Sequence, residues 1–169
     1  MIKIYTSYFY QVRNMRPGCL AFSTAFSDPA WFKKDGQPWI DKNGVLNGLR
    51  AEPFVPNIDL PPQDSCQGPK NCKFLKEDLP WQCPFLDAYE KQIYSLDPWE
   101  MEGRFRVIGM KWRELNNEPD MPLTFILLVH EAPTNSCSER VVLQKWLRDN
   151  NMGGEEWTKD IKEIGKNRW

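Results

Sequence analysis

Three stretches of the chain carry the runs of apolar, β-branched and aromatic residues that are typical of β-strands. They extend from Ile2 to Tyr10, from Cys19 to Phe26 and from Leu123 to His130. The third is almost wholly apolar, which is typical of a parallel strand that is covered on both faces by helices. Arg16-Pro17-Gly18 separates the first two stretches and predicts a turn.

Three later segments repeat their apolar residues at spacings of three and four, which predicts helices. The predicted helices span Pro84 to Leu96, Pro98 to about Asn116, and about Cys137 to Asn150, the last ended by Gly153-Gly154. The second start is well marked, because Asp97 can cap the helix, Pro98 suits its first position and Glu100 favours its dipole. Strands separated by helices indicate an α/β fold with a mostly parallel sheet.

The length of 169 residues suits one domain with a core and is too short for two. Prolines and glycines interrupt every regular pattern from about residue 36, and cysteines follow to residue 83, so we expect a long irregular insertion over about 36–83. A charged tail is expected over about 153–169, where Trp157, Ile161 and Ile164 are available for docking on the domain.

The charge is nearly balanced, with 22 basic and 23 acidic residues and a formal net charge of -1. This argues against bulk binding to nucleic acid or to an anionic membrane, although a local basic patch stays possible. The longest apolar run, Phe125 to Val129, is far shorter than the roughly 20 residues of a membrane span. The N-terminus lacks the features of a signal peptide, so a cytoplasmic location with reduced thiols is expected.

The strand that ends near His130 leads through a short loop into the third predicted helix. Ser136 and Glu139 match the S-x-x-E capping box and mark the expected start of that helix. A buried strand that feeds a capped helix presents backbone N–H groups at the carboxyl edge of the sheet. Open α/β sheets bind ligands there, and these ligands are often anionic.

Several polar side chains are predicted to meet at this edge. The candidate ligand-binding residues are Thr6, Ser7, Tyr8, Ser136, Ser138 and Arg140. Arg140 would meet an anion, and Glu131, at the end of the strand, is a polar or acid–base partner, so these two are the catalytic candidates. The alternative is that Glu131 and Arg140 form a structural ion pair and that Ser136 only caps the helix. His130, a lone histidine on an apolar strand, is expected to be a core residue.

Three cysteines, Cys66, Cys72 and Cys83, lie within 18 residues of proline-rich, irregular chain. Loops rarely bury small apolar side chains at that density. With Cys137 they make a set of four thiol ligands, which suits tetrahedral zinc or an iron–sulfur cluster. The spacing matches neither a common zinc module nor a standard ferredoxin, so it does not choose the metal. Reactive or merely packed cysteines are the alternative, and Cys19 is expected in the core.

Cys137 has a second interpretation, because it falls in the first turn of the predicted helix. The helix dipole lowers the pKa of a thiol in that position and favours the thiolate. A thiolate either binds a metal or attacks an electrophile. A nucleophilic pair with His130 is not expected, since His130 is not obviously placed as the base.

The segment from Leu127 to Pro133, followed by Cys137-Ser138-Glu139-Arg140, resembles the C-terminal signature of the proteins grouped as domain of unknown function 488. In that family a strand that ends in Glu leads to a Cys-His-Arg or similar motif that opens a helix. The middle of the chain, with Cys66, Cys72 and Cys83-Pro84, is similar to a cysteine-rich subgroup with a Cys-Ser-Glu-Arg motif. The resemblance implies a small Rossmann-like, open sheet flanked by helices, and no settled activity. Ser138 stands where the commoner motif has histidine, which argues against acid–base chemistry by that residue here.

Three functions fit these observations. The first is a small enzyme or sensor for a nucleotide, a nucleoside or a nucleic-acid end, with a phosphorylated ligand over the edge of the sheet and a metal that organises the loop. The second is a non-catalytic, metal-stapled module that binds a protein partner through exposed tryptophans. Trp31, Trp39, Trp81 and Trp99 lie in or beside predicted loops, and they either form such contacts or pack over the sheet. The third is redox chemistry by an iron–sulfur cluster or a thiol switch.

Overall fold

A five-stranded sheet in the order β5-β2-β6-β1-β7 forms the centre of the computed structural model, which describes residues 2–61, 72–76, 83–135 and 137–160. The strands are β1 (Ile4–Tyr8), β2 (Cys19–Ser23), β5 (Leu49–Arg50), β6 (Thr124–Val129) and β7 (Gly153–Glu156). Every neighbouring pair runs parallel. The predicted α/β fold with a parallel sheet is therefore confirmed, and its topology is compatible with a Rossmann-like arrangement.

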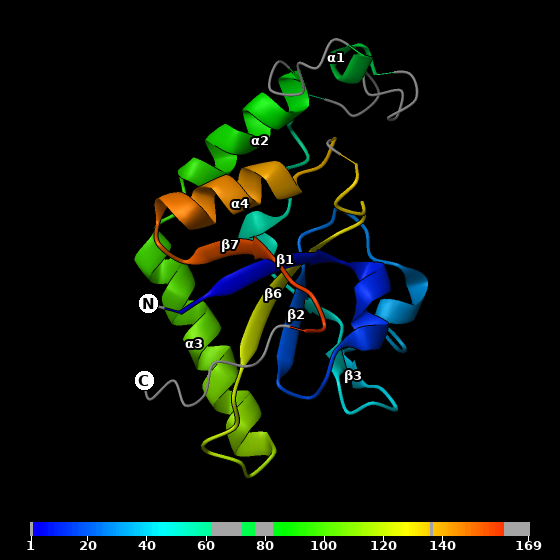
Figure 1. Ribbon diagram of the computed structural model, residues 1–169, viewed down its shortest axis with the longest axis vertical. Helices are drawn as coiled ribbons and strands as arrows, with labels where there is room; N and C mark the ends of the chain where they lie inside the picture. Colours follow the sequence, from blue (N-terminus) through cyan, green and yellow to red (C-terminus); the bar gives the residue numbers. More distant parts are fainter. Residues whose placement is uncertain (1, 62–71, 77–82, 136, 161–169) are drawn as a thin grey trace.

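The two faces of the sheet are covered by different kinds of structure (Figure 1). The α-helices are α1 (Lys73–Lys76), α2 (Pro84–Tyr94), α3 (Pro98–Leu115) and α4 (Arg140–Asp149). Helices α2, α3 and α4 pack on one face, here called the helix face. The 3-10 turns η1 (Phe9–Asn14) and η2 (Ala30–Phe32) pack on the opposite face, the turn face, beside a short antiparallel hairpin of β3 (Trp39–Ile40) and β4 (Leu46–Asn47). A third 3-10 turn, η3 (Glu52–Phe54), belongs to the helix face.

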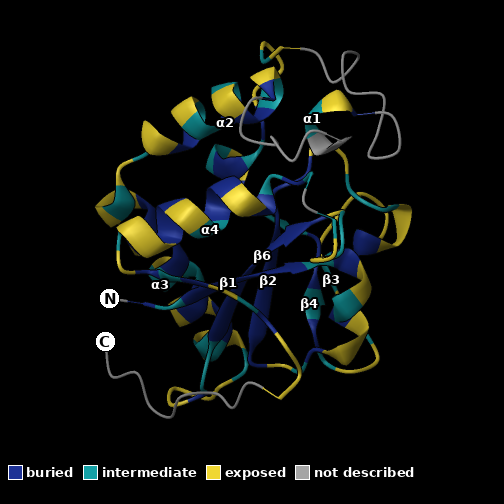
Figure 2. Ribbon diagram, turned by 45° about the horizontal axis from the view of Figure 1, so that its top comes forward, coloured by how far each residue is buried: buried dark blue, intermediate teal, exposed yellow. Residues whose placement is uncertain are grey.

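Strand β6 is apolar throughout because both of its faces are buried. Phe125, Leu127 and Val129 point to the helix face, whereas Ile126 and Leu128 point to the turn face. Figure 2 shows the strands as buried and the outer surfaces of α2 and α4 as exposed. The alternation follows from the two-residue period of a strand and places one apolar layer on each side of the sheet.

The connections between strands define where a ligand is expected. Strands β1 and β2 lie on either side of β6, and the segments that follow them pack on the turn face. Helix α4 follows β6 and packs on the helix face. Adjacent strands whose connections leave on opposite faces open a crevice at their carboxyl ends, which is the usual ligand site of open α/β sheets. The carboxyl end of β6 is therefore the switch point of this fold.

Helix α3 has the start that the sequence predicts. The Asp97 carboxylate accepts hydrogen bonds from the backbone N–H groups of Trp99, at 2.8 Å, and Glu100, at 3.1 Å. Met101, Phe105 and Trp112 are buried as their spacing predicts. Leu115, the last residue of α3, is 81% exposed.

The structure corrects the expectations for several shorter segments. The first strand ends at Tyr8, and η1 begins at Phe9. The insertion expected over about 36–83 contains the β3–β4 hairpin and β5, a member of the main sheet. The tail expected over about 153–169 begins with strand β7, and Trp157 is buried on the turn face. No helix among the described ranges is long and apolar enough to cross a membrane.

Candidate functional site

Arg140 is the centre of a hydrogen-bond network at the carboxyl edge of the sheet. Its Nε donates to Glu156 Oε2 at 2.9 Å, and its Nη2 donates to the backbone oxygen of Glu131 at 2.6 Å. Only 5% of Arg140 is exposed. The arginine thus joins α4, β7 and the loop after β6. The alternative expectation, an ion pair between Arg140 and the Glu131 carboxylate, is wrong. The carboxylate that pairs with Arg140 belongs to Glu156.

Thr6 and Gln144 complete this carboxyl-edge network around Glu156. Thr6 Oγ1 donates to Glu156 Oε2 at 2.8 Å and accepts from Gln144 Nε2 at 2.7 Å. Burial raises the pKa of Glu156, although the hydrogen bonds from Thr6 and Arg140 act in the opposite direction. Sequence reasoning missed Glu156, since it lies in the segment that was expected to be a tail.

The residues predicted to bind a ligand are only partly brought together. Thr6 and Arg140 share Glu156, and the Arg140 guanidinium lies 5.9 Å from the centre of the Tyr8 ring. Ser7 points to the opposite face of the sheet from Thr6, because successive strand residues alternate. Its buried Oγ has no partner among the described residues, and the same holds for Arg140 Nη1. Ser136 lies outside the described residues.

The loop before α4 differs from the predicted capping box. Helix α4 begins at Arg140, and Glu139 precedes it without a capping hydrogen bond from its side chain. Ser138 Oγ accepts from the backbone N–H of Arg140 at 3.2 Å, so Ser138 satisfies the helix start. Cys137 lies in the loop, where its backbone N–H donates to Asn135 Oδ1 at 3.0 Å. Cys137 therefore precedes α4, whereas the sequence predicts it in the first turn of the helix.

A small polar hollow of about 120 Å³ lies between the carboxyl ends of β2 and β6. Its lining residues are Thr24, Ala25, Phe26, Ser27, Val129, His130, Glu131 and Glu139. Ser138 Oγ donates to Glu131 Oε2 at 2.9 Å and holds that carboxylate in place. His130 is exposed rather than buried in the core as expected, and its Nε2 lies 2.7 Å from the backbone oxygen of Ser27. The hollow coincides with the switch point of the fold.

Glu139 is the second carboxyl group of the polar hollow. Burial raises its pKa, and the neighbouring Glu131 carboxylate raises it further. Two neighbouring carboxyl groups, one of them with a raised pKa, are a common arrangement for proton transfer. The sequence suggested only a capping role for Glu139.

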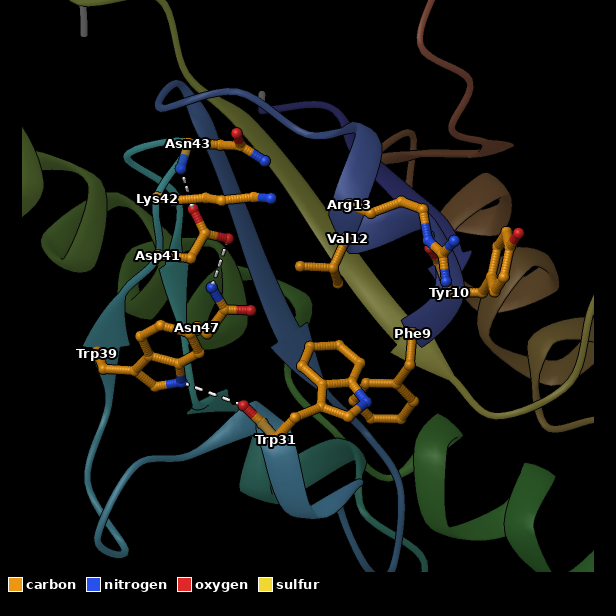
Figure 3. A pocket seen from close by; sticks show the side chains of 10 residues that line it. All are labelled: Phe9, Tyr10, Val12, Arg13, Trp31, Trp39, Asp41, Lys42, Asn43 and Asn47. Atoms are coloured by element: carbon orange, nitrogen blue, oxygen red, sulfur yellow. Dashed lines mark hydrogen bonds between the residues drawn. The ribbon is translucent and has the colours of Figure 1, made fainter.

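A larger aromatic cavity of about 810 Å³ opens on the turn face (Figure 3). It is lined by Phe9, Tyr10, Val12, Arg13, Trp31, Trp39, Asp41, Lys42, Asn43 and Asn47. The ring centre of Phe9 lies 4.9 Å from that of His130 and 6.3 Å from that of Trp31. Phe9 thus contacts residues of both sites, Trp31 of this cavity and His130 of the polar hollow. Trp31 and Trp39 were singled out in the sequence, whereas the cavity itself was not predicted.

The cysteines fall into different environments. Cys19 is buried in the core on the turn face, as expected. Cys83 precedes α2 and packs in the core of the helix face, so packing accounts for at least one loop cysteine. Cys72 is buried, Cys137 is partly buried, and Cys66 lies outside the described residues. Within the described part of the chain, no three His, Cys, Asp or Glu residues are grouped as a metal site would require. The four-cysteine site stays a prediction, and Cys72, Cys83 and Cys137 are not grouped for it in the described part of the chain.

Elemental analysis of protein purified without oxygen or added metal tests this prediction. A four-cysteine site predicts about one zinc per chain, or iron and sulfide with a visible charge-transfer band. Cys66→Ser should then lower the metal content, whereas Cys19→Ser, a change in the core, should keep the stoichiometry of the folded fraction. A wild-type protein without zinc, iron or sulfide would eliminate the site.

The chain matches none of the family models, curated proteins or solved structures with which it was compared. The resemblance to domain of unknown function 488 therefore stays a prediction, and the site must be interpreted from its own geometry.

Proposed function

We propose that the protein binds a nucleoside-type ligand at the carboxyl end of β6, where Glu131 and Glu139 exchange protons with it. The observation that carries this proposal is the polar hollow at the switch point, which two carboxyl groups line. Such a site suits a small enzyme or a sensor, the first of the functions that the sequence favours.

The charge of the hollow supports a sugar or base rather than a phosphate as its occupant. The Glu131 carboxylate, together with Glu139 whenever it is ionised, lowers the electrostatic potential there and repels an anion. Arg140, the cation expected to bind phosphate, is buried and donates to Glu156 and to the Glu131 backbone. Hydroxyl and amino groups are the natural partners of carboxylates, because they donate hydrogen bonds.

The two carboxyl groups have different roles in this proposal. The raised pKa of Glu139, which follows from burial and then from Glu131, favours the protonated form that can donate a proton to a ligand oxygen or ring nitrogen. Glu131 is fixed by the Ser138 hydroxyl and can accept a proton or a hydrogen bond. His130 lines the same hollow and is oriented by the backbone of Ser27.

Thermal unfolding with a panel of nucleosides and nucleotides tests the proposal. A nucleoside at 100 times its Kd should stabilise the protein by about 2.7 kcal/mol. The double variant Glu131→Gln/Glu139→Gln should lose most of this stabilisation, whereas Glu114→Gln, an exposed change on α3, should keep it. If no nucleoside or nucleotide raises the Tm of the wild-type protein, the proposal is wrong.

Glu139→Gln should also change how stability depends on pH. Because the pKa of Glu139 is raised in the folded protein, its proton stabilises the fold at low pH, and this contribution is lost as the pH rises through the folded pKa. The glutamine variant should therefore be more stable than the wild type at pH 7 and equally stable below the ordinary pKa of 4.5. Urea unfolding at pH 4 and pH 7 measures this difference. A variant that is less stable than the wild type at pH 7 would contradict the environment described for Glu139.

A further inference from the structure

We infer that the aromatic cavity is a binding site for a planar heterocycle that carries an N–H donor, such as the exocyclic amino group of adenine or cytosine. This inference deepens the proposed function by naming the ligand class. It rests on the proposed function in one respect: the ring in the aromatic cavity and the sugar at the polar hollow are taken to belong to the same ligand. The cavity volume of about 810 Å³ lies within the usual range for small-molecule sites.

The hydrogen bonds of the Asn47 side chain indicate that the ligand carries an N–H donor. Asn47 is only 1% exposed, and its Nδ2 donates to Asp41 Oδ2 at 3.0 Å and to the backbone oxygen of Val45 at 3.1 Å. Both partners are acceptors, so the orientation of the amide is fixed by its hydrogen bonds. Oδ1 therefore points away from Asp41 (Figure 3), in a side chain that lines the cavity.

Asn47 Oδ1 has no hydrogen-bond partner among the described residues. A buried acceptor without a partner costs about 1–3 kcal/mol. A ligand N–H group would supply the missing donor, whereas a ligand carbonyl oxygen would repel this oxygen. The cavity should therefore select rings with a donor at this point. The oxygen has almost no solvent-accessible surface, so a ligand reaches it only by displacing the side chains that cover it.

The walls of the cavity suit a flat ring. Trp31, Trp39 and Phe9 contribute aromatic surfaces, and the Trp39 indole is anchored through its Nε1, which donates to the backbone oxygen of Trp31 at 3.2 Å. Stacking of one base on an aromatic side chain contributes about 1–3 kcal/mol. Such stacking and the acceptor at Asn47 together define an amino-substituted heteroaromatic ring.

The charged residues of the cavity do not oppose a nucleotide. Asp41 is occupied within its own hairpin, where its Oδ1 accepts from the backbone N–H groups of Asn43, at 2.8 Å, and Val45, at 3.1 Å. Arg13 and Lys42 also line the cavity and are exposed. These cations attract a phosphate on the ligand, so a nucleoside and its monophosphate are both suitable probes.

Calorimetric titration with adenosine and with purine riboside tests the donor directly. Purine riboside has the same ring and sugar but no amino group. We expect adenosine to bind at least about 10-fold more tightly, which corresponds to about 1.4 kcal/mol. Equal affinities for the two nucleosides would overturn the role of Asn47. No binding of adenosine, cytidine or their monophosphates would overturn the inference as a whole.

Trp31→Ala should weaken adenosine binding at least about 10-fold through lost stacking, and Trp31→Phe should keep most of the affinity. Trp99→Ala is the matched control, since Trp99 is 73% exposed on α3 and does not line the cavity. Equal affinities of Trp31→Ala and Trp99→Ala would overturn the inference. Binding that survives in Glu131→Gln/Glu139→Gln but is lost in Trp31→Ala would support the cavity and contradict the proposed function. The reverse pattern would overturn this inference alone.

Discussion

Replacement of Arg140 by alanine is expected to lower the free energy of unfolding by about 3–5 kcal/mol. The guanidinium is buried and joins α4 to the Glu156 carboxylate of β7 and to the Glu131 backbone after β6. Its loss leaves the partly buried Glu156 carboxylate without its cation and a backbone oxygen without its donor. Urea unfolding at pH 7 measures the effect.

Arg148→Ala, an exposed change on the same helix, is the matched control and should cost far less. Combination of Arg140→Met with Glu156→Leu should recover part of the loss, because no unpaired charge then stays buried. If Arg140→Ala is as stable as Arg148→Ala but no longer binds ligand, the structural role is wrong. The arginine would then be the anion contact that the sequence suggests.

Gly154→Ala is expected to cost more than about 2 kcal/mol. Gly154 has a φ of +88°, a conformation that costs other residues about 1–2 kcal/mol. A Cβ atom at this position would also lie 2.6 Å from the backbone oxygen of Gln144, so α4 or β7 would have to move. Strand β7 carries Glu156, and the same change should therefore weaken the network around Arg140.

Gly103→Ala provides the control for this prediction. Gly103 lies within α3, and a Cβ atom there would meet no other atom within 4 Å. Alanine stabilises an open helical position by about 0.5–1 kcal/mol relative to glycine. Thermal unfolding of both variants should give Tm changes of opposite sign. A Gly154→Ala protein as stable as the wild type would contradict the described path of the chain into β7.

The sequence predicts those parts of the fold whose pattern is local and repeated. Strands β1, β2 and β6 and helix α3 have runs, periodicity or caps within a single segment. Strands β5 and β7 have two and four residues, and β7 begins with two glycines. Their pairing depends on neighbouring strands that are distant in sequence, so no local pattern predicts them.

The site likewise has parts that a local sequence pattern predicts and parts that depend on contacts between distant segments. The strand that leads to Glu131 is visible in the sequence, and Glu131 follows it at the carboxyl edge of the sheet, as predicted. Glu156 and Asn47 were missed because their roles arise from β7 and from the packing of a hairpin on the turn face. Glu139 was interpreted as a capping residue, since the burial and the neighbouring carboxylate that raise its pKa are tertiary effects.

The most direct test of a nucleoside site at the carboxyl end of β6 is an NMR titration of uniformly ¹⁵N-labelled protein with adenosine. A nucleoside site there predicts chemical-shift changes in the backbone amides of Thr24 to Ser27, His130, Glu131 and Glu139, and in the indole N–H of Trp39, which lines the aromatic cavity. The indole of Trp99 should not shift. A spectrum that does not change with saturating adenosine or its monophosphate, or changes confined to α3, would contradict the account.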